Sequence, residues 1–151
     1  MSGKPLICVI DANVALKLFF DQPLSEPADK LFAHLAENTG ARFCVPDFFY
    51  AECASAFVNY TRFSKYPVAD AKKDLEALRE LNFNVIPTSD LAIDAFTIAV
   101  THRLNGYDAF YVALAAQITA PLITADEKLV AAMKNKAFRV EWLGDFVIPP
   151  A

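Results

Sequence analysis

The sequence predicts an α/β sandwich built on a mainly parallel sheet. Residues 6–10 are apolar at every position, which is typical of a strand buried on both faces in a sheet covered by helices. Short apolar segments of this kind alternate along the chain with longer segments of helical periodicity. The chain has 151 residues and shows no internal repeat and no linker, so we expect residues 1–151 to form a single domain.

Five short strands and seven helices are predicted in alternation. The strands span residues 6–10, 42–45, 83–86, 121–124 and 138–142. The helices span residues 13–20, 25–37, 47–63, 68–81, 88–104, 107–118 and 126–134. Ser25 is the expected N-cap of the second helix. The helix at 68–81 is rich in charge, which predicts a solvated face with ion pairs between residues four apart.

Composition and charge limit the classes of function. Fourteen Lys and Arg against 18 Asp and Glu give a net charge of −4, so the molecule as a whole does not attract a polyanion, and a nucleic-acid substrate would need a local reversal of this sign. No apolar run approaches the roughly 18 residues of a membrane span, and no secretory signal is evident. We therefore expect a cytoplasmic protein. Cys8, Cys44 and Cys53 lack the spacing of a zinc site and are predicted to be buried free thiols.

Four acidic residues stand where apolar residues or a strand end are expected. Asp11 and Asp126 each follow a buried strand, at the edge of an open sheet where α/β proteins bind ligands. Glu52 lies three residues after Phe49 and four before Ala56, so it shares the apolar stripe of its helix. Asp108 lies three residues before Tyr111 and opens a helix on its buried side. Both helices are therefore expected to turn a carboxylate toward the sheet.

Each acid taken alone also has an interpretation that involves structure only. Asp11 can bind the N-terminus of the helix that begins near Asn13, and Asp108 lies in a first helical turn, where negative charge is favourable. Residues 124–127 have the form of a capping box, with Thr124 as the N-cap and Glu127 at the third helical position. Glu52 has no such capping role.

The four carboxylates together are harder to explain by structure alone. Two unit charges about 5 Å apart repel by roughly 3 kcal/mol at an effective dielectric near 20, and a domain has only about 5 to 15 kcal/mol of total stability. A cluster of these acids must share protons or hold a cation. Because oxygen ligands without Cys or His favour hard ions, Mg²⁺ or Mn²⁺ is the expected ion.

Four segments resemble the acidic motifs of PIN-domain ribonucleases, and above all the VapC toxins of type II toxin–antitoxin systems. They are VIDANV at 9–14, PDFFYAE at 46–52, GYDAFYVALA at 106–115 and LITADEKL at 122–129. The resemblance implies a three-layer α/β/α fold, a metal-dependent endoribonuclease, a homodimer, and a VapB-type antitoxin that holds the enzyme inactive. It also implies that the catalytic and metal-binding acids are Asp11, Glu52, Asp108 and Asp126, with Asn13 and Thr124 as supporting polar residues.

This hypothesis predicts a mechanism. Asp11 and Asp108 would hold Mg²⁺ directly or through water, while Glu52 and Asp126 complete the shell or orient the attacking water, and cleavage would leave a 5′ phosphate and a 3′ hydroxyl. One ion or two remains open. Lys17 and Lys128 are candidates for contacts with flanking phosphates of the RNA.

Two rival hypotheses are considered. A phosphatase that forms an aspartyl phosphate would also place an acid after the first strand, but such enzymes commonly carry a second acid two residues on, and here that residue is Asn13. A catalytically silent PIN-like module that binds RNA or protein is the other, although it gives no reason to keep four mutually repelling carboxylates.

Overall fold

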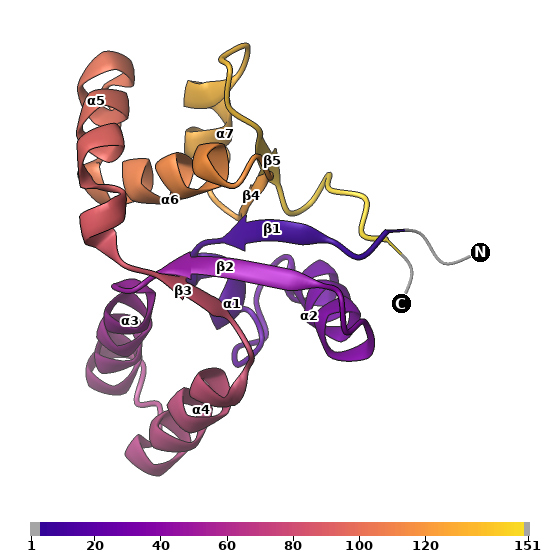
Figure 1. Cartoon of the computed structure of the whole chain (residues 1–151). Helices are drawn as coiled ribbons and strands as arrows, with labels where there is room; N and C mark the ends of the chain where they lie inside the picture. The colour runs from indigo at the N-terminus through magenta and orange to yellow at the C-terminus, as the bar shows by residue number, and fades with distance from the viewer. Residues whose placement is uncertain (1–3, 150–151) are drawn as a thin grey trace.

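A parallel sheet of five strands forms the middle layer of the computed structural model, which describes residues 4–149 (Figure 1). The strand order is β3-β2-β1-β4-β5, and every neighbouring pair is parallel. The strands are β1 (Ile7–Ile10), β2 (Arg42–Pro46), β3 (Asn84–Ile86), β4 (Leu122–Thr124) and β5 (Val140–Trp142). The predicted parallel α/β sheet is confirmed.

Helices cover both faces of this sheet. In Figure 1, the helices α5, α6 and α7 lie above the sheet and α1 to α4 lie below it. Their bounds are α1 (Ala12–Leu16), α2 (Ser25–Glu37), α3 (Phe49–Phe63), α4 (Val68–Glu80), α5 (Ala92–His102), α6 (Gly106–Gln117) and α7 (Glu127–Met133), with a short 3₁₀ helix η1 (Thr88–Asp90) before α5. The three-layer α/β/α architecture is therefore also confirmed.

The strand order reverses at β1, and we call the region beyond the carboxyl end of β1 the crevice. From β1 the chain goes to β2 and β3 on one side, whereas β4 and β5 lie on the other. Val9 is opposite Cys44 of β2 and opposite Leu122 of β4. Because the strand order reverses at β1, the crevice beyond its carboxyl end is where ligands bind in open α/β sheets. Asp11 is the residue that follows β1.

The core explains why these strands are short and apolar. Val9 and Ile10 of β1 are fully buried, although their side chains point to opposite faces, because helices cover both sides. On α6 a continuous run from Val112 to Ala115 is buried. The buried part of α6 is packed against the sheet, and it holds the first turn of the helix over the carboxyl end of the sheet.

Two helices differ from their predicted extent. The helix predicted at 13–20 ends at Leu16, because the next turns use hydrogen bonds between residues three apart, such as Leu18 N to Ala15 O. The helix predicted at 88–104 is divided into η1 and α5 at Leu91, whose side chain is fully buried. Its end comes early because Arg103 adopts the left-handed conformation, with φ of 56°.

Ser25 is not the N-cap of α2, as the sequence had suggested. Leu24 occupies the cap position with φ of 74°, and it has no side-chain cap hydrogen bond. The hydroxyl of Ser25 instead accepts from Gln22 N and donates to Phe20 O, so it stabilises the turn before the helix.

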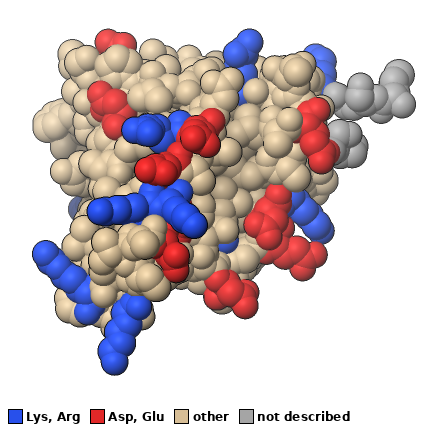
Figure 2. All heavy atoms as spheres, turned by 90° about the horizontal axis from the view of Figure 1, so that it is seen from below, with Lys and Arg blue, Asp and Glu red and all other residues tan. Residues whose placement is uncertain are grey.

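The prediction for the charged helix holds in one respect only. In α4 the buried residues are Ala71 and Leu78, and the face of the molecule below the sheet carries interspersed charges of both signs (Figure 2). The expected ion pairs along α4 are absent, since the one ion pair within residues 4–149 joins Lys30 and Glu26 of α2.

No helix in the described part of the chain is long and apolar enough to cross a membrane.

Candidate active site

Asp11 is a buried carboxylate at the centre of the crevice. It caps α1, and only 7% of its surface is exposed. Its Oδ1 accepts from Val14 N at 3.3 Å, and its Oδ2 accepts from the hydroxyl of Thr124 at 2.5 Å. Burial raises the pKa of Asp11 to about 7 despite these hydrogen bonds, and the charges of Asp108 and Glu52 add to the rise. The fold therefore buries the carboxyl group of Asp11 where water solvates its ionised form poorly.

Thr124 and Asn13 connect the two loops that flank Asp11. Besides donating to Asp11, Thr124 Oγ1 accepts from Asp126 N at 3.0 Å. Asn13 Oδ1 accepts from Ala125 N at 3.1 Å. The end of β4 is thus fixed against the start of α1 by two polar side chains, which are the two that the resemblance implied as supporting residues.

Asp126, and not Thr124, is the N-cap of α7. Its Oδ1 accepts from Lys128 N at 2.9 Å and from Leu129 N at 3.4 Å. The capping box proposed for residues 124–127 is therefore wrong. Thr124 is still part of β4, and its hydroxyl faces the neighbouring strand end at Asp11. A residue in the strand cannot also serve as the cap of the helix that begins at Glu127.

Glu52 of α3 is held by a tyrosine from the opposite layer. Its Oε1 accepts from the hydroxyl of Tyr111 at 2.6 Å, and Tyr111 is 2% exposed. Burial and this hydrogen bond both raise the pKa of the Tyr111 hydroxyl, which stays a proton donor. The sequence alone marks Tyr111 only as part of the buried face of its helix. Its position three residues after Asp108 was the signal that it also faces the acids.

The four acids lie within electrostatic reach of one another. Burial raises the pKa of Asp108, and the charges of Asp126 and Glu52 raise it further. Glu52 and Asp11 together raise the pKa of the buried Cys53, for which burial is the larger cause. Each of the four acids therefore repels at least one of the others, although they come from elements far apart in the sequence.

The four acids do not form a closed ligand shell. Within residues 4–149, no group of three or more His, Cys, Asp or Glu side chains is arranged closely enough to hold a metal ion. Three of the carboxylates are turned to donors of the protein itself, namely Thr124 and Val14 for Asp11, Tyr111 for Glu52, and the α7 backbone for Asp126.

Comparison with known proteins places this arrangement in a family. The model of the PIN domain matches residues 8–135, which is most of the chain and includes all four acids. The chain belongs to the PIN-domain family. Among curated relatives of this PIN domain, Ribonuclease VapC3 of Pyrobaculum aerophilum is 29% identical over 123 residues, which are 80% of this chain and 90% of the relative. Ribonuclease VapC1 of Mycobacterium tuberculosis is 42% identical over 62 residues, 41% of this chain and 46% of the relative. That second match spans less than half of the length of the M. tuberculosis protein.

Solved structures agree with the PIN fold. PAE2754 from Pyrobaculum aerophilum is similar with a TM-score of 0.65 and 22% identity, covering 87% of this chain and 90% of that one. A toxin–antitoxin complex from Klebsiella pneumoniae has a similar chain, with a TM-score of 0.59, 20% identity and coverage of 84% and 92%. The family match and the curated VapC relatives together confirm the resemblance to VapC-type PIN ribonucleases.

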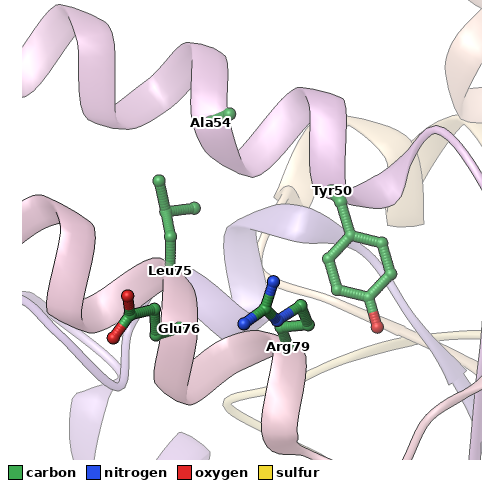
Figure 3. A pocket seen from close by; sticks show the side chains of 5 residues that line it. All are labelled: Tyr50, Ala54, Leu75, Glu76 and Arg79. Carbon is green, nitrogen blue, oxygen red and sulfur yellow. The ribbon is translucent and has the colours of Figure 1, made fainter.

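A second hollow of this PIN domain lies away from the acids. It has a volume of about 540 Å³ and lies between α3 and α4 (Figure 3). Ala54 and Leu75 form its apolar part, and Tyr50, Glu76 and Arg79 complete its lining. None of the four acids is among its lining residues, so it is separate from the crevice at Asp11.

The cysteines take no part in the crevice as ligands. Cys8, Cys44 and Cys53 are all buried and free, as predicted. Burial raises the pKa of Cys53 to about 12, and it raises the pKa of Cys8 and Cys44 as well. Because the thiols are buried and neutral, the carboxylate oxygens are the atoms of this site that can bind a metal ion.

Proposed function

We propose that this PIN domain is a metal-dependent endoribonuclease and the toxin of a toxin–antitoxin pair. The observation that carries the proposal is the buried Asp11, coupled to Glu52 and Asp108, at the point where the strand order reverses. Structural roles alone do not require three carboxylates in each other's field. The curated relatives named above, which are called ribonucleases, support the same conclusion.

The chemistry of the donor set fits Mg²⁺ or Mn²⁺, and to hold the ion together the carboxylates must turn from their present hydrogen-bond partners. We assign Asp11, Glu52, Asp108 and Asp126 as its ligands, with Asp11 and Asp108 in the central role, because all four offer hard oxygen atoms and no thiol or imidazole accompanies them. When bound, the ion supplies positive charge for the phosphate oxygens and lowers the pKa of the attacking water. It would also relieve the cost of burying the Asp11 charge.

The chain's own residues prepare the carboxylates for this task. Thr124 and Val14 N fix both oxygens of Asp11, so its orientation is set before substrate arrives. Tyr111 does the same for one oxygen of Glu52, leaving the other to orient a water. Asn13 keeps the Asp126 loop at the same place by its bond to Ala125 N. In-line attack of the water on phosphorus with loss of the 3′ oxygen leaves a 5′ phosphate and a 3′ hydroxyl.

The partners follow from the same proposal. We expect a VapB-type antitoxin to hold the enzyme inactive, as the similar chain in the Klebsiella pneumoniae toxin–antitoxin complex supports. Free buried thiols without disulfides agree with a reducing compartment, so we expect the protein in the cytoplasm with its RNA substrate.

We also propose that two copies associate through α5. Ile93, Phe96 and Val100 are 82%, 69% and 65% exposed and recur at the spacing of one helical face. In an antiparallel pair about a two-fold axis near Phe96, Ile93 of one copy comes opposite Val100 of the other, so the apolar face meets its own copy.

The decisive experiment is RNA cleavage by the purified protein with mapping of the new ends. We expect total RNA with Mn²⁺ to yield discrete fragments that carry 5′ phosphates, and we expect EDTA, Asp11→Asn or Asp108→Asn to stop cleavage. Variants that cleave like the wild type would contradict the assignment of these acids. A protein that binds RNA without cutting it would favour the silent module, and hydrolysis of p-nitrophenyl phosphate instead of RNA would favour the phosphatase.

A further inference from the structure

A groove adjoins the acidic crevice on the side of α7. It has a volume of about 730 Å³, and its lining includes Lys17, Leu24, Asp126, Lys128 and Trp142. Asp126 belongs to both the groove and the group of four acids. The groove therefore begins at the proposed catalytic centre and leads away from it over the ends of α1, α7 and β5. Its volume is within the range of sites that hold a small organic molecule.

Two unneutralised positive charges lie in this groove. The ammonium of Lys17 donates to Gln22 Oε1 at 3.1 Å, which fixes its direction without cancelling its charge. Lys128 is exposed in the first turn of α7. Neither lysine has a carboxylate within ion-pair distance in the described part of the chain. The lining also contains the carboxylates of Asp126 and Glu127, so the two lysines bring the groove to about neutral on a protein of net charge −4 and offer a polyanion two unpaired cations.

An aromatic ring completes the lining. Trp142 ends β5, and its indole packs on Gly144, where a Cβ would come within 2.5 Å of the ring. Only glycine permits this packing, so the ring is held at a fixed place beside the groove. A fixed aromatic surface next to positive charges is the combination with which proteins hold single-stranded nucleic acid, through base stacking and phosphate contacts.

We propose that this groove binds the nucleotide next to the scissile phosphate of single-stranded RNA. Lys17 and Lys128 each contact one of the two flanking phosphates, and Trp142 contacts the base. This inference rests on the proposed ribonuclease function for its choice of RNA, but it assigns a separate binding role to three residues outside the acidic centre.

Trp142 makes the inference directly measurable, because it is the only tryptophan in the sequence. A fluorescein-labelled oligouridylate is titrated into the Asp108→Asn protein with Mg²⁺, so that RNA is bound but not cut. We expect saturable quenching of tryptophan emission with the same midpoint as the rise in fluorescein anisotropy. An anisotropy rise without any change in tryptophan emission would overturn the inference.

Variants then separate the roles of the three side chains. Replacing Lys17 and Lys128 together by Ala is expected to weaken binding and to lower the slope of log affinity against log salt by about 1.4, at about 0.7 per phosphate contact of a single strand. Trp142→Phe keeps a ring and removes an indole N–H that has no acceptor among residues 4–149, and it is expected to weaken binding about threefold to tenfold. Lys30→Ala is the matched control, since its charge is already paired with Glu26.

The outcomes distinguish this inference from the ribonuclease proposal. If the wild type cleaves RNA but the lysine pair variant keeps the full salt slope, the groove inference fails and the ribonuclease stands. If the wild type never cleaves RNA but the titration behaves as described, the groove stands and the ribonuclease fails. An oligoglutamate that quenches Trp142 as strongly as the oligouridylate would show a general anion site and would overturn the assignment to RNA.

Discussion

Asp11 carries the highest electrostatic cost of any residue in the crevice, because it is buried beside other acids. In EDTA we expect Asp11→Asn to stabilise the fold by about 1 kcal/mol, since the lost buried charge outweighs weaker hydrogen bonds from Val14 and Thr124. Mg²⁺ or Mn²⁺ at 100 times its dissociation constant is expected to stabilise the wild type by about 2.7 kcal/mol, or about 5 to 10 °C in Tm.

Thermal unfolding of both proteins, with and without the metal, checks this expectation. Asn at position 11 is predicted to abolish most of the rise in Tm that the metal produces. The contrary result is an equal rise in the two proteins, which would place the ion elsewhere, or no rise in either, which would remove the metal from the proposal.

Tyr111 is expected to act as a positioning residue for Glu52. Tyr111→Phe keeps the packed ring and removes the donor to Glu52 Oε1. Because hydrogen bonds to charged groups contribute about 1.5 to 3 kcal/mol and Glu52 is still partly solvated, we expect a loss at the low end, which is about a tenfold drop in kcat with little change in KM. Tyr107→Phe, on the exposed side of the same helix, is the control, and equal kcat values for the two variants would refute the role.

At the scale of elements, the strands and the layers could be predicted because burial on both faces leaves a direct signature in the sequence. Residues 6–10 are apolar throughout and form β1 almost as expected. The helix ends were harder, because they depend on backbone angles that composition does not reveal. Leu24 at φ of 74° and Arg103 at φ of 56° are examples, since neither is a residue type that favours this conformation.

The same contrast holds for the candidate site. The acids were found because Asp11 follows a strand and Glu52 interrupts an apolar stripe, and both are local patterns. The partner of Glu52 was not found, because the bond to Tyr111 joins residues 59 positions apart. Likewise, the hydroxyl of Thr124 serves Asp11, 113 positions away, and not the adjacent helix. Contacts between layers require the tertiary structure.

Alanine variants of two glycines test whether the indole of Trp142 packs beside the groove as described. Gly144→Ala places a Cβ within 2.5 Å of the Trp142 ring, so we expect a loss of about 1 to 3 kcal/mol in the free energy of unfolding. Gly106→Ala at the start of α6 meets no atom within 4 Å and is expected to change stability by less than 1 kcal/mol, in the stabilising direction. Denaturant unfolding of both variants measures the difference, and similar midpoints would contradict the packing of the indole on Gly144.

At the scale of the whole molecule, the apolar face of α5 is the feature that a monomer does not explain. Three large apolar side chains in a row, each more than half exposed, form a patch of the kind that marks a protein interface. We propose that this face of α5 is the interface of the homodimer that the family resemblance implies. In Figure 1, α5 lies above the sheet, in the layer opposite α3 and α4.

Phe96→Asp is the change that tests this assembly. A charge at the centre of the patch must be desolvated for two copies to meet, and it would face the same charge across the two-fold axis. We expect the wild type to sediment at about twice the chain mass of 16.7 kDa and the variant to sediment as a monomer with an unchanged circular dichroism spectrum. Phe63→Asp is the matched control, because Phe63 is 80% exposed at the end of α3, in the opposite layer, and is expected to leave the dimer intact. Dissociation by Phe63→Asp with none by Phe96→Asp would move the interface from α5 to α3, and a monomeric wild type would refute the dimer itself.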